Sequence, residues 1–296
     1  MFHLIKKLPL TILSVLMIHI HHFFKTLLFL EGRLMNKLGI LGWPLTTTYS
    51  PLIHNKLFEL SGLEGSYQII KQEEINSQII SEINNDLLGY NITIPHKEKI
   101  IYLQKSAILS ASVKDIGACN TVLNRNSKIY LFNTDFSGFK TFLNLIQYDF
   151  CKKSVLILGS GGSAKAIAYT LKLQNINYFI ASRHSNENTI SYNEIVKIGS
   201  DIDLVINTTP VGMPPFNHGE LPIKWNNLPN IKTVINLGYG SKNTFLNQFD
   251  DSIAKYDGLG MLVCQAIESF NIWTSAGLNT SRIYGEVIKE LENIDD

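Results

Sequence analysis

The sequence predicts an α/β fold in which helices cover both faces of a mainly parallel sheet. From Met35 onward, short apolar runs typical of buried strands alternate with stretches of helical periodicity. This alternation favours parallel strands joined by crossover helices. A second unit with the same alternation begins near Phe150. Of the 296 residues, 45% are apolar, which is enough for a full core in one large domain or two ordinary ones.

The first unit is predicted to open with a short strand at residues 37–41 that ends at Gly42. The run SPLIHNKLFELSGL then predicts a helix, with Ser50 as its N-cap and Pro51 in its first turn. Strand-like YQIIKQ, helical EEINSQIISEIN and strand-like LLGYNITIP continue the alternation.

The second unit is predicted to begin with KSVLILGSGGSAKAIAYTLKLQ, a buried strand, a glycine-rich turn and a helix. Strands are also expected in INYFIASR, SDIDLVINTTPVGM and KTVINLGYG, and the polar stretch 184–193 is expected to be a solvated loop leading into a helix. After Asp257, GMLVCQAIESFNIWTSAGL predicts a further helix. Its apolar residues recur at helical spacing: Leu262, Ala266, Phe270 and Trp273.

Charge and cysteine content argue against several classes of function. The formal net charge is +1, which gives no electrostatic reason to expect a nucleic-acid partner. The cysteines, Cys119, Cys151 and Cys264, form neither a CxxC pair nor a metal-ligand spacing. This sparse, odd set suits a reducing compartment, so we expect a cytoplasmic protein with no disulfide framework and no metal.

Residues 1–34 do not continue the α/β pattern. Lys6 and Lys7 precede an apolar run at 8–20 that resembles a signal peptide but is shorter than the roughly 20 residues of a membrane span. Because Met35 begins MNKLGILGWP, which looks like the first strand of a soluble domain, we interpret 1–34 as an extension that the working protein lacks. A signal peptide and a membrane anchor are the alternatives.

A glycine-rich turn, GSGGSA, lies between a predicted strand and a predicted helix. Gly159, Gly161 and Ala164 satisfy G-x-G-x-x-A, a pattern that lets backbone N–H groups approach a pyrophosphate at the helix N-terminus. The predicted cofactor contacts here are Gly159, Ser160, Gly161, Gly162, Ser163 and Ala164. The alternative is a turn that needs glycine only for close packing of strand on helix.

The next strand decides between NAD and NADP. It ends at Ser182 and Arg183, with no carboxylate at its tip to accept from a ribose 2′-OH. A guanidinium suits the 2′-phosphate of NADP. We therefore predict NADP, and the alternative for Arg183 is an exposed loop arginine.

A lysine follows directly after a predicted strand in NITIPHKEKI. Pro95 ends the strand, and Lys97 comes two residues later. The residues alone allow two interpretations, a strand-to-helix corner with solvated charges or a lysine directed into a cleft.

Several segments, in the same order along the chain, together resemble the shikimate dehydrogenase family, NADP-dependent enzymes of aromatic amino-acid biosynthesis. They are GWPLTTTYSPLIHN, NITIPHKE, GACNTV, FNTDFSG, LGSGGSAKA, DLVINTTPVGM and DGLGMLVCQA. The resemblance covers Met35 to the C-terminus. It implies an α/β substrate-binding domain, 35–134 with 263–296, and a Rossmann-type NADP-binding domain, 135–262. The C-terminal helices return to the substrate domain, and the substrate site lies between the domains.

The resemblance also implies the roles of individual residues. Lys97 and Asp135 match the catalytic pair that contacts the hydroxyl being oxidised, and a lysine held by a carboxylate can relay the proton that this hydroxyl loses. The implied substrate contacts are Thr48, Ser50, Thr93, Asn120, Asp135, Tyr239 and Gln265. The implied cofactor contacts beyond the glycine turn are Ser182, Arg183, Thr208, Met213, Leu237 and Gly258.

The chain departs from the family pattern at both ends of the expected site. Trp43, Thr47 and Thr48 replace the usual asparagine, histidine and serine, and Thr48 adds a methyl group beside the carboxylate site. Glu187 stands where the family has a second basic residue for the 2′-phosphate.

The resemblance implies reversible, NADPH-dependent reduction of 3-dehydroshikimate to shikimate. Glu187 and Thr48 keep open an NAD-using quinate/shikimate dehydrogenase, and a ligand sensor on the same fold is a further alternative, although the presence of both Lys97 and Asp135 argues against it. The expected partner is the small-molecule substrate, without nucleic acid or membrane, and a homodimer is left open.

Overall fold

The computed structural model describes residues 36–45, 48–149, 154–214, 216, 219–240 and 244–295, with side chains up to Leu291. Residues 37–296 form one compact unit, which contains all the features below. The interpretations of residues 1–34, Thr47 and Cys151 concern positions outside the described ranges. No helix within these ranges combines the length and apolar character needed to cross a bilayer.

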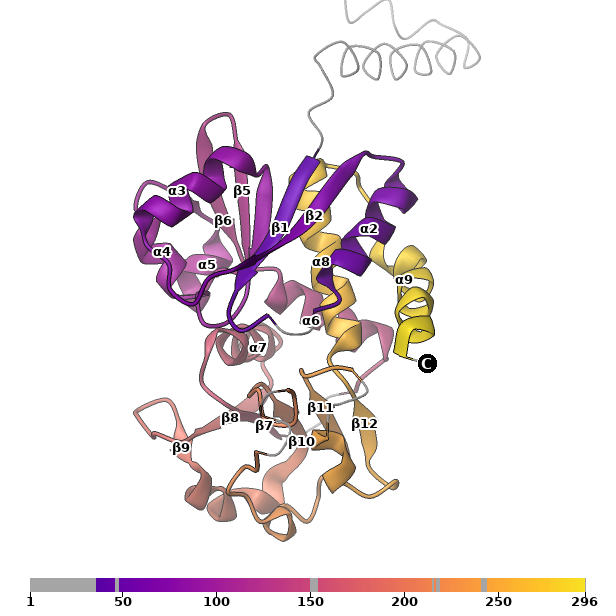
Figure 1. Ribbon diagram of the computed structural model, residues 1–296. Helices are drawn as coiled ribbons and strands as arrows, with labels where there is room; N and C mark the ends of the chain where they lie inside the picture. Colours follow the sequence, from indigo (N-terminus) through magenta and orange to yellow (C-terminus); the bar gives the residue numbers. More distant parts are fainter. Residues whose placement is uncertain are drawn as a thin grey trace, which may run out of the picture. The chain divides into compact units, whose positions relative to one another are not determined.

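The first of two six-stranded sheets has the strand order β2-β1-β3-β5-β6-β4 (Figure 1). Its strands are β1 (Asn36–Gly42), β2 (Gly65–Lys71), β3 (Gly89–Ile92), β4 (Ile108–Leu109), β5 (Thr121–Arg125) and β6 (Lys128–Phe132). β1 pairs with β3 in parallel, with Leu38 opposite Gly89, and β4 pairs with β6 in parallel. β5 is antiparallel to both β3 and β6.

The β5–β6 hairpin is a feature that the alternation of strands and helices did not predict. Its turn residues, Asn126 and Ser127, have φ of 53° and 58°. Two successive residues with positive φ form the kind of tight turn whose twist matches that of a hairpin. This hairpin carries the chain from Asn120 back to Asn133, so that two segments of the pocket described below lie side by side.

Helices cover both faces of the first sheet, as predicted. α3 (Ser77–Asp86), α4 (Lys99–Leu103) and α5 (Ala111–Ile116) cover one face, around a buried cluster that includes Leu41, Ile80 and Ile100. The other face is covered by α2 (Ser50–Ser61), α8 (Leu259–Thr274) and α9 (Thr280–Asp295).

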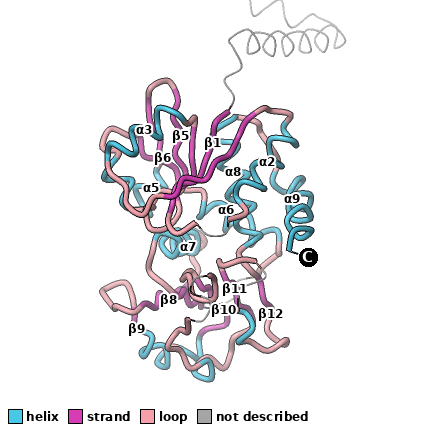
Figure 2. The backbone as a smooth tube through the Cα atoms, in the orientation of Figure 1, coloured by secondary structure: helices cyan, strands magenta, loops and turns pink. Residues whose placement is uncertain are grey.

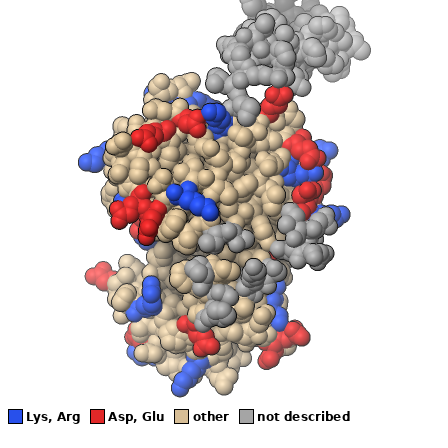
Figure 3. Space-filling view, in the orientation of Figure 1, with Lys and Arg blue, Asp and Glu red and all other residues tan. Residues whose placement is uncertain are grey.

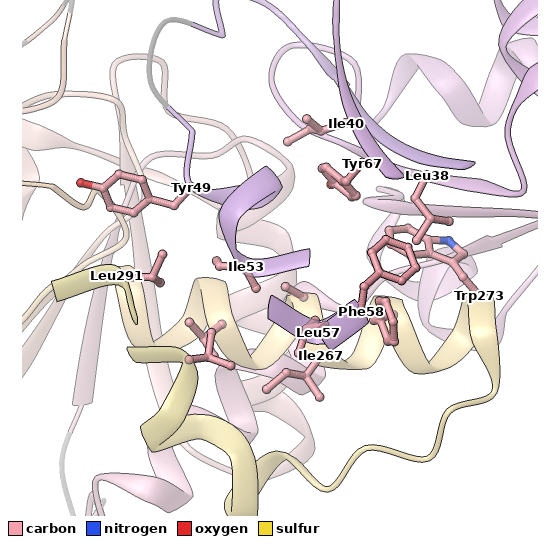
Figure 4. Close-up of a cluster of buried hydrophobic side chains, with 14 of the residues drawn as sticks. Leu38, Ile40, Tyr49, Ile53, Leu57, Phe58, Tyr67, Ile267, Trp273 and Leu291 are labelled. Atoms are coloured by element: carbon pink, nitrogen blue, oxygen red, sulfur yellow. The ribbon is translucent and has the colours of Figure 1, made fainter. Parts of the chain in front are cut away.

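Figure 4 shows the buried cluster between the first sheet and the helices α2, α8 and α9. In it, Leu38 and Ile40 of β1 face Ile53 and Leu57 of α2 and Ile267 of α8. The stripe predicted on α8 lies in this cluster: Ala266, Phe270 and Trp273 are buried, and Leu262 packs against them. The C-terminal helices therefore return to the first sheet, as the family resemblance implied.

Ser50 is not the N-cap of its helix, contrary to the prediction. α2 begins at Ser50 itself, and the cap position belongs to Tyr49, which makes no side-chain capping hydrogen bond. The Ser50 N–H donates to Thr48 Oγ1 at 3.2 Å, and the Thr48 hydroxyl donates to Ser50 Oγ at 3.2 Å. The Thr48 hydroxyl thus hydrogen-bonds to the first residue of α2. Pro51 lies in the first turn of this helix, as expected.

The second sheet has the order β12-β11-β10-β7-β8-β9, and its neighbouring strands are parallel. Its strands are β7 (Ser154–Leu158), β8 (Asn177–Ser182), β9 (Ile190–Ser191), β10 (Ile202–Asn207), β11 (Thr233–Asn236) and β12 (Ala254–Tyr256). The chain leaves β7 towards β8 on one side and returns as β10 on the other. In open α/β sheets, ligands bind at the carboxyl ends of the strands where the strand order reverses in this way.

The second sheet also has two covered faces. α6 (Asp135–Leu145), α7 (Gly162–Leu173) and α8 pack on one face around Phe139, Ile167 and Met261. Short 3₁₀ segments cover the other: η2 (Tyr192–Lys197), η3 (Gly199–Asp201), η4 (Trp225–Asn227) and η5 (Phe245–Gln248). Figure 2 shows this division, with helices nearer the first sheet and mostly loops beyond the second. The predicted α/β fold with mainly parallel sheets is confirmed.

Charged side chains are spread over the visible face of the protein. In Figure 3, Lys and Arg are interspersed with Asp and Glu, and neither sign forms one large patch on that face.

α2 carries a fully buried histidine whose protonation is linked to folding. The ring of His54 stacks on Tyr67 with centroids 4.1 Å apart and an interplanar angle of 10°. Burial lowers the pKa of His54 to about 3 from its ordinary 6.5. The folded protein therefore keeps this ring neutral at pH values at which the unfolded chain binds a proton.

We expect His54 to make folding sensitive to acid. Its contribution to the free energy of unfolding is complete above about pH 6.5 and is lost as the pH falls towards 3, by about 1.4 kcal/mol per pH unit. Urea unfolding should be measured at about pH 7.5 and at about pH 5. Between these two pH values, the free energy of unfolding should fall less for His54→Phe than for the wild type. His184→Gln, at an exposed histidine, should behave as the wild type, and equal losses in all three proteins would contradict this assignment.

Candidate active site

One pocket brings together residues from the ends of both sheets. The pocket is lined by the predicted catalytic and substrate-binding residues and by some of the predicted cofactor contacts. They are Thr48, Ser50, Thr93, Lys97, Asn120, Asp135, Ser163, Thr208, Met213, Leu237, Tyr239, Gly258 and Gln265. The remaining predicted cofactor residues are outside this lining: Gly159, Ser160, Gly161, Gly162, Ala164, Ser182 and Arg183. Apolar side chains, among them Ile40, Met261 and Leu262, complete the wall.

Lys97 lies in the turn between β3 and α4, and its side chain lies in this pocket. Its Nζ is 2.7 Å from Oδ2 of Asp135, and the two side chains are only 12% and 8% exposed. The backbone holds the turn in place, because Cys119 N donates to the Lys97 carbonyl at 2.8 Å and buried His96 contacts the Gln72 carbonyl through Nε2 at 2.7 Å. Of the two interpretations of this lysine, the structure supports the one in which it enters a cleft.

Asp135 is held from three sides. It is the first residue of α6, where the helix dipole favours a carboxylate. Its backbone N–H donates to Asn133 Oδ1 at 3.1 Å. Its Oδ1 accepts from Asn120 Nδ2 at 2.9 Å, while Oδ2 accepts from Lys97. Because both oxygens have donors, the carboxylate has a fixed orientation towards the lysine.

Asn120 links the ion pair to the rest of the pocket. Its amide oxygen accepts from Thr134 N at 2.6 Å, and its Nδ2 also reaches Gln265 Oε1 at 3.3 Å. Gln265 is fixed in turn by donating from Nε2 to the Leu262 carbonyl at 2.9 Å. The predicted residues Asn120, Asp135 and Gln265 thus form one hydrogen-bonded group.

Sequence reasoning missed the polar layer behind this group. Ser269 Oγ lies 2.9 Å from both Thr121 Oγ1 and Thr134 Oγ1, and it accepts from Asn91 Nδ2 at 3.1 Å. Tyr67 donates to Asn91 Oδ1 at 2.8 Å. Ser269 follows Gln265 by one helical turn of α8, and this spacing is the signal that could have found it. Fully paired buried polar groups fix the geometry of what they support.

The other predicted substrate contacts also line the pocket. Thr48 and Ser50 share the hydroxyl pair at the start of α2. Tyr239 is partly buried, and its ring lies 5.3 Å from that of Tyr49. Desolvation raises the pKa of its phenol, which stays neutral. Thr93 lines the pocket directly after β3. Trp43, where the family has asparagine, is 39% exposed and lies outside the pocket lining.

The glycine turn between β7 and α7 fits a dinucleotide. Gly159 has φ of 104°, and a Cβ at this position would lie 2.7 Å from Thr208 Oγ1. Both the backbone conformation and the lack of space therefore disfavour any other residue here. α7 has Gly161 as its N-cap, without a side-chain capping bond. A Cβ on Gly161 would meet nothing within 4 Å, so its backbone borders open space. These are the properties of a helix N-terminus that accepts a phosphate.

Arg183 follows β8 at the tip of the second sheet. It is exposed, and among the described residues it has no ion-pair or hydrogen-bond partner. Buried Ser182 donates to the His184 carbonyl, which shapes the turn. Glu187 is exposed in the same loop. Within the described ranges, no group of three or more His, Cys, Asp or Glu is arranged to hold a metal ion.

Comparison with known proteins decides the family. The model of the shikimate dehydrogenase substrate-binding domain matches residues 40–122. A shikimate dehydrogenase (NADP(+)) of Staphylococcus aureus strain Newman is 33% identical over 285 residues, which cover 86% of this chain and 99% of that protein. The chain belongs to the shikimate dehydrogenase family.

Solved structures of this family agree with the fold. Shikimate dehydrogenase 1 of Peptoclostridium difficile is 32% identical, with a TM-score of 0.77, and the match covers 86% of this chain and 99% of that one. Shikimate 5-dehydrogenase of Thermus thermophilus, solved in complex with NADP(H) and shikimate, is 25% identical with a TM-score of 0.75, over 86% and 100% of the two chains.

Proposed function

We propose that this shikimate dehydrogenase family member catalyses the reversible, NADPH-dependent reduction of 3-dehydroshikimate to shikimate. The observation that carries the proposal is the Lys97–Asp135 pair, 2.7 Å apart and nearly buried, in a pocket that Ser163 of the glycine turn also lines. NADP supplies or accepts the hydride. The pair handles the proton that must move on the substrate oxygen when the hydride is transferred.

The remaining pocket residues bind and orient the substrate. Thr48 and Ser50 present hydroxyl groups that suit the substrate carboxylate, and Thr93, Asn120 and Gln265 suit its ring hydroxyls. Support comes from their presence together in the pocket lining and from the hydrogen bonds that orient Asn120 and Gln265. Tyr239 closes the site beside the hydroxyl pair at the start of α2.

We further propose that residues 35–134 and 263–296 form the substrate domain and that 135–262 form the NADP domain. Each sheet has its own buried clusters, and α9 packs against α2 and α8, which lie on the first sheet. We also propose that the protein works in the cytoplasm, which is supported by the free buried thiols of Cys119 and Cys264. Light scattering of the purified protein tests whether it is a homodimer.

Arg183 is expected to set the preference for NADP over NAD. Arg183 is exposed and has no partner among the described residues, so its guanidinium is available for a 2′-phosphate. One charge-assisted contact contributes roughly 1.5–3 kcal/mol, about 10- to 150-fold in affinity. We expect Arg183→Ala to erase most of the preference for NADP, measured as the ratio of kcat/KM with NADP to kcat/KM with NAD. Glu187→Arg should raise this ratio.

Arg282→Ala provides the control, because Arg282 is also exposed but lies on α9 outside the pocket lining. It should leave the ratio unchanged. The same assays with quinate in place of shikimate test substrate choice. Equal use of NAD and NADP by the unmodified protein, together with turnover of quinate, would instead support the NAD-using quinate/shikimate alternative.

A further inference from the structure

The start of α7 touches the catalytic lysine directly. Lys97 Nζ donates to Ser163 Oγ at 3.0 Å, besides its 2.7 Å contact with Asp135. Ser163 is the second residue of α7 and lies in the glycine turn predicted to bind the cofactor. One hydroxyl group therefore joins the nucleotide-binding turn to the proton-transfer lysine.

The aliphatic part of the lysine is held by the same helix. A Cβ on Gly162 would lie 3.1 Å from Lys97 Cβ and 3.2 Å from its Cδ, so a side chain at this position would crowd the lysine stem. Next to this contact, Lys165 Nζ lies 2.7 Å from Glu98 Oε2. Gly162 thus brings the first turn of α7 against the turn that carries Lys97.

The ammonium group has three N–H donors, and the structure uses two of them. Asp135 and Ser163 together define the direction of the Cε–Nζ bond, which leaves the third donor for the substrate oxygen. Without Ser163, the lysine would keep its ion pair but could rotate about it. A proton-transfer group acts efficiently only when it lies within hydrogen-bond reach in the right direction.

We propose that Ser163 is a positioning residue for catalysis, whose hydroxyl orients the ammonium of Lys97 towards the substrate. This assignment rests on the function proposed above, and it adds a role to the cofactor contact that the sequence predicted for Ser163. It also links the cofactor-binding turn to the proton-transfer group through one hydroxyl group.

The first test is a split between kcat and KM. Ser163→Ala should lower kcat about 5- to 20-fold, with the KM values for shikimate and NADP changed less than about twofold. Ser163→Thr keeps a hydroxyl and should restore most of the loss. Glu98→Gln weakens the neighbouring ion pair between the same two segments, which is partly exposed and does not touch the Lys97 ammonium, and it should leave kcat near the wild-type value.

The second test asks whether Ser163 acts through Lys97. In a Lys97→Ala background, Ser163→Ala should cost nothing further, because the group it positions is gone. An equal loss in both backgrounds, or a loss confined to the KM for NADP, would overturn the proposal and leave Ser163 as a cofactor-binding residue. Wild-type kcat in Ser163→Ala would also overturn it. Near-normal turnover in Lys97→Ala alone would remove the proton-transfer role of Lys97 and overturn this proposal with it, whereas no turnover of shikimate by the wild-type protein is the separate outcome that would contradict the proposed function.

Discussion

Replacement of Lys97 by alanine is expected to lower kcat by about 10²–10⁴-fold, the usual loss when a positioned proton-transfer group is removed. The KM for shikimate should change much less, because Thr48, Ser50, Asn120 and Gln265 still line the pocket. The reason is that the ammonium helps most when charge develops on the substrate oxygen, so its absence raises the barrier more than it weakens binding. Steady-state kinetics in both reaction directions measure the effect.

Lys99→Ala is the matched control. Lys99 lies two residues further along, is exposed, and is outside the pocket lining. It should leave both kcat and KM near their wild-type values. If Lys97→Ala turned over at a rate close to that of Lys99→Ala, Lys97 could not be the proton-transfer group, and the 2.7 Å ion pair with Asp135 would have to be structural.

Replacement of Asp135 by asparagine should reduce kcat and raise KM together. The carboxylate accepts from Lys97 at 2.7 Å and from Asn120 at 2.9 Å. An amide of the same shape removes the charge that holds the ammonium, and its NH₂ group adds a donor beside existing donors. Removing one partner of a nearly buried ion pair leaves the other charge poorly compensated. We expect kcat/KM to fall by about 10²-fold or more.

The cause of that loss can be separated from general damage to the fold. Asp250→Asn makes the same chemical change at an exposed position outside the pocket lining and should have no kinetic effect. Thermal unfolding of Asp135→Asn shows whether the variant remains folded under the assay conditions. A folded Asp135→Asn protein with an unchanged KM would contradict a substrate contact at Asp135, and unchanged kcat would contradict its role beside Lys97.

The alternation of strands and helices was readable because it is local. A buried parallel strand such as Ser154–Leu158 is a continuous apolar run, and the helix that follows it shows its own periodicity. The β5–β6 hairpin was not predicted, because its turn, Asn126-Ser127, lacks the glycine that usually marks such turns. The cap of α2 was misplaced by one residue for a similar reason: Thr48, Tyr49 and Ser50 compete for that position, and only the backbone geometry decides.

By itself, the sequence determined the family and the glycine turn, and it predicted which lysine and aspartate form the proton-transfer pair, because these depend on residue types within short segments. What only the tertiary structure decided is which of these segments meet. Lys97 and Asp135 are 38 residues apart, and Lys97 and Ser163 are 66 apart. Nothing local encodes those contacts. They arise because the β5–β6 hairpin returns the chain to the end of the sheet at which β3 finishes, and because the N-terminus of α7 packs on the turn after β3. Ser269 and Asn91 likewise gained their place in the polar network only when α8 packed against the first sheet.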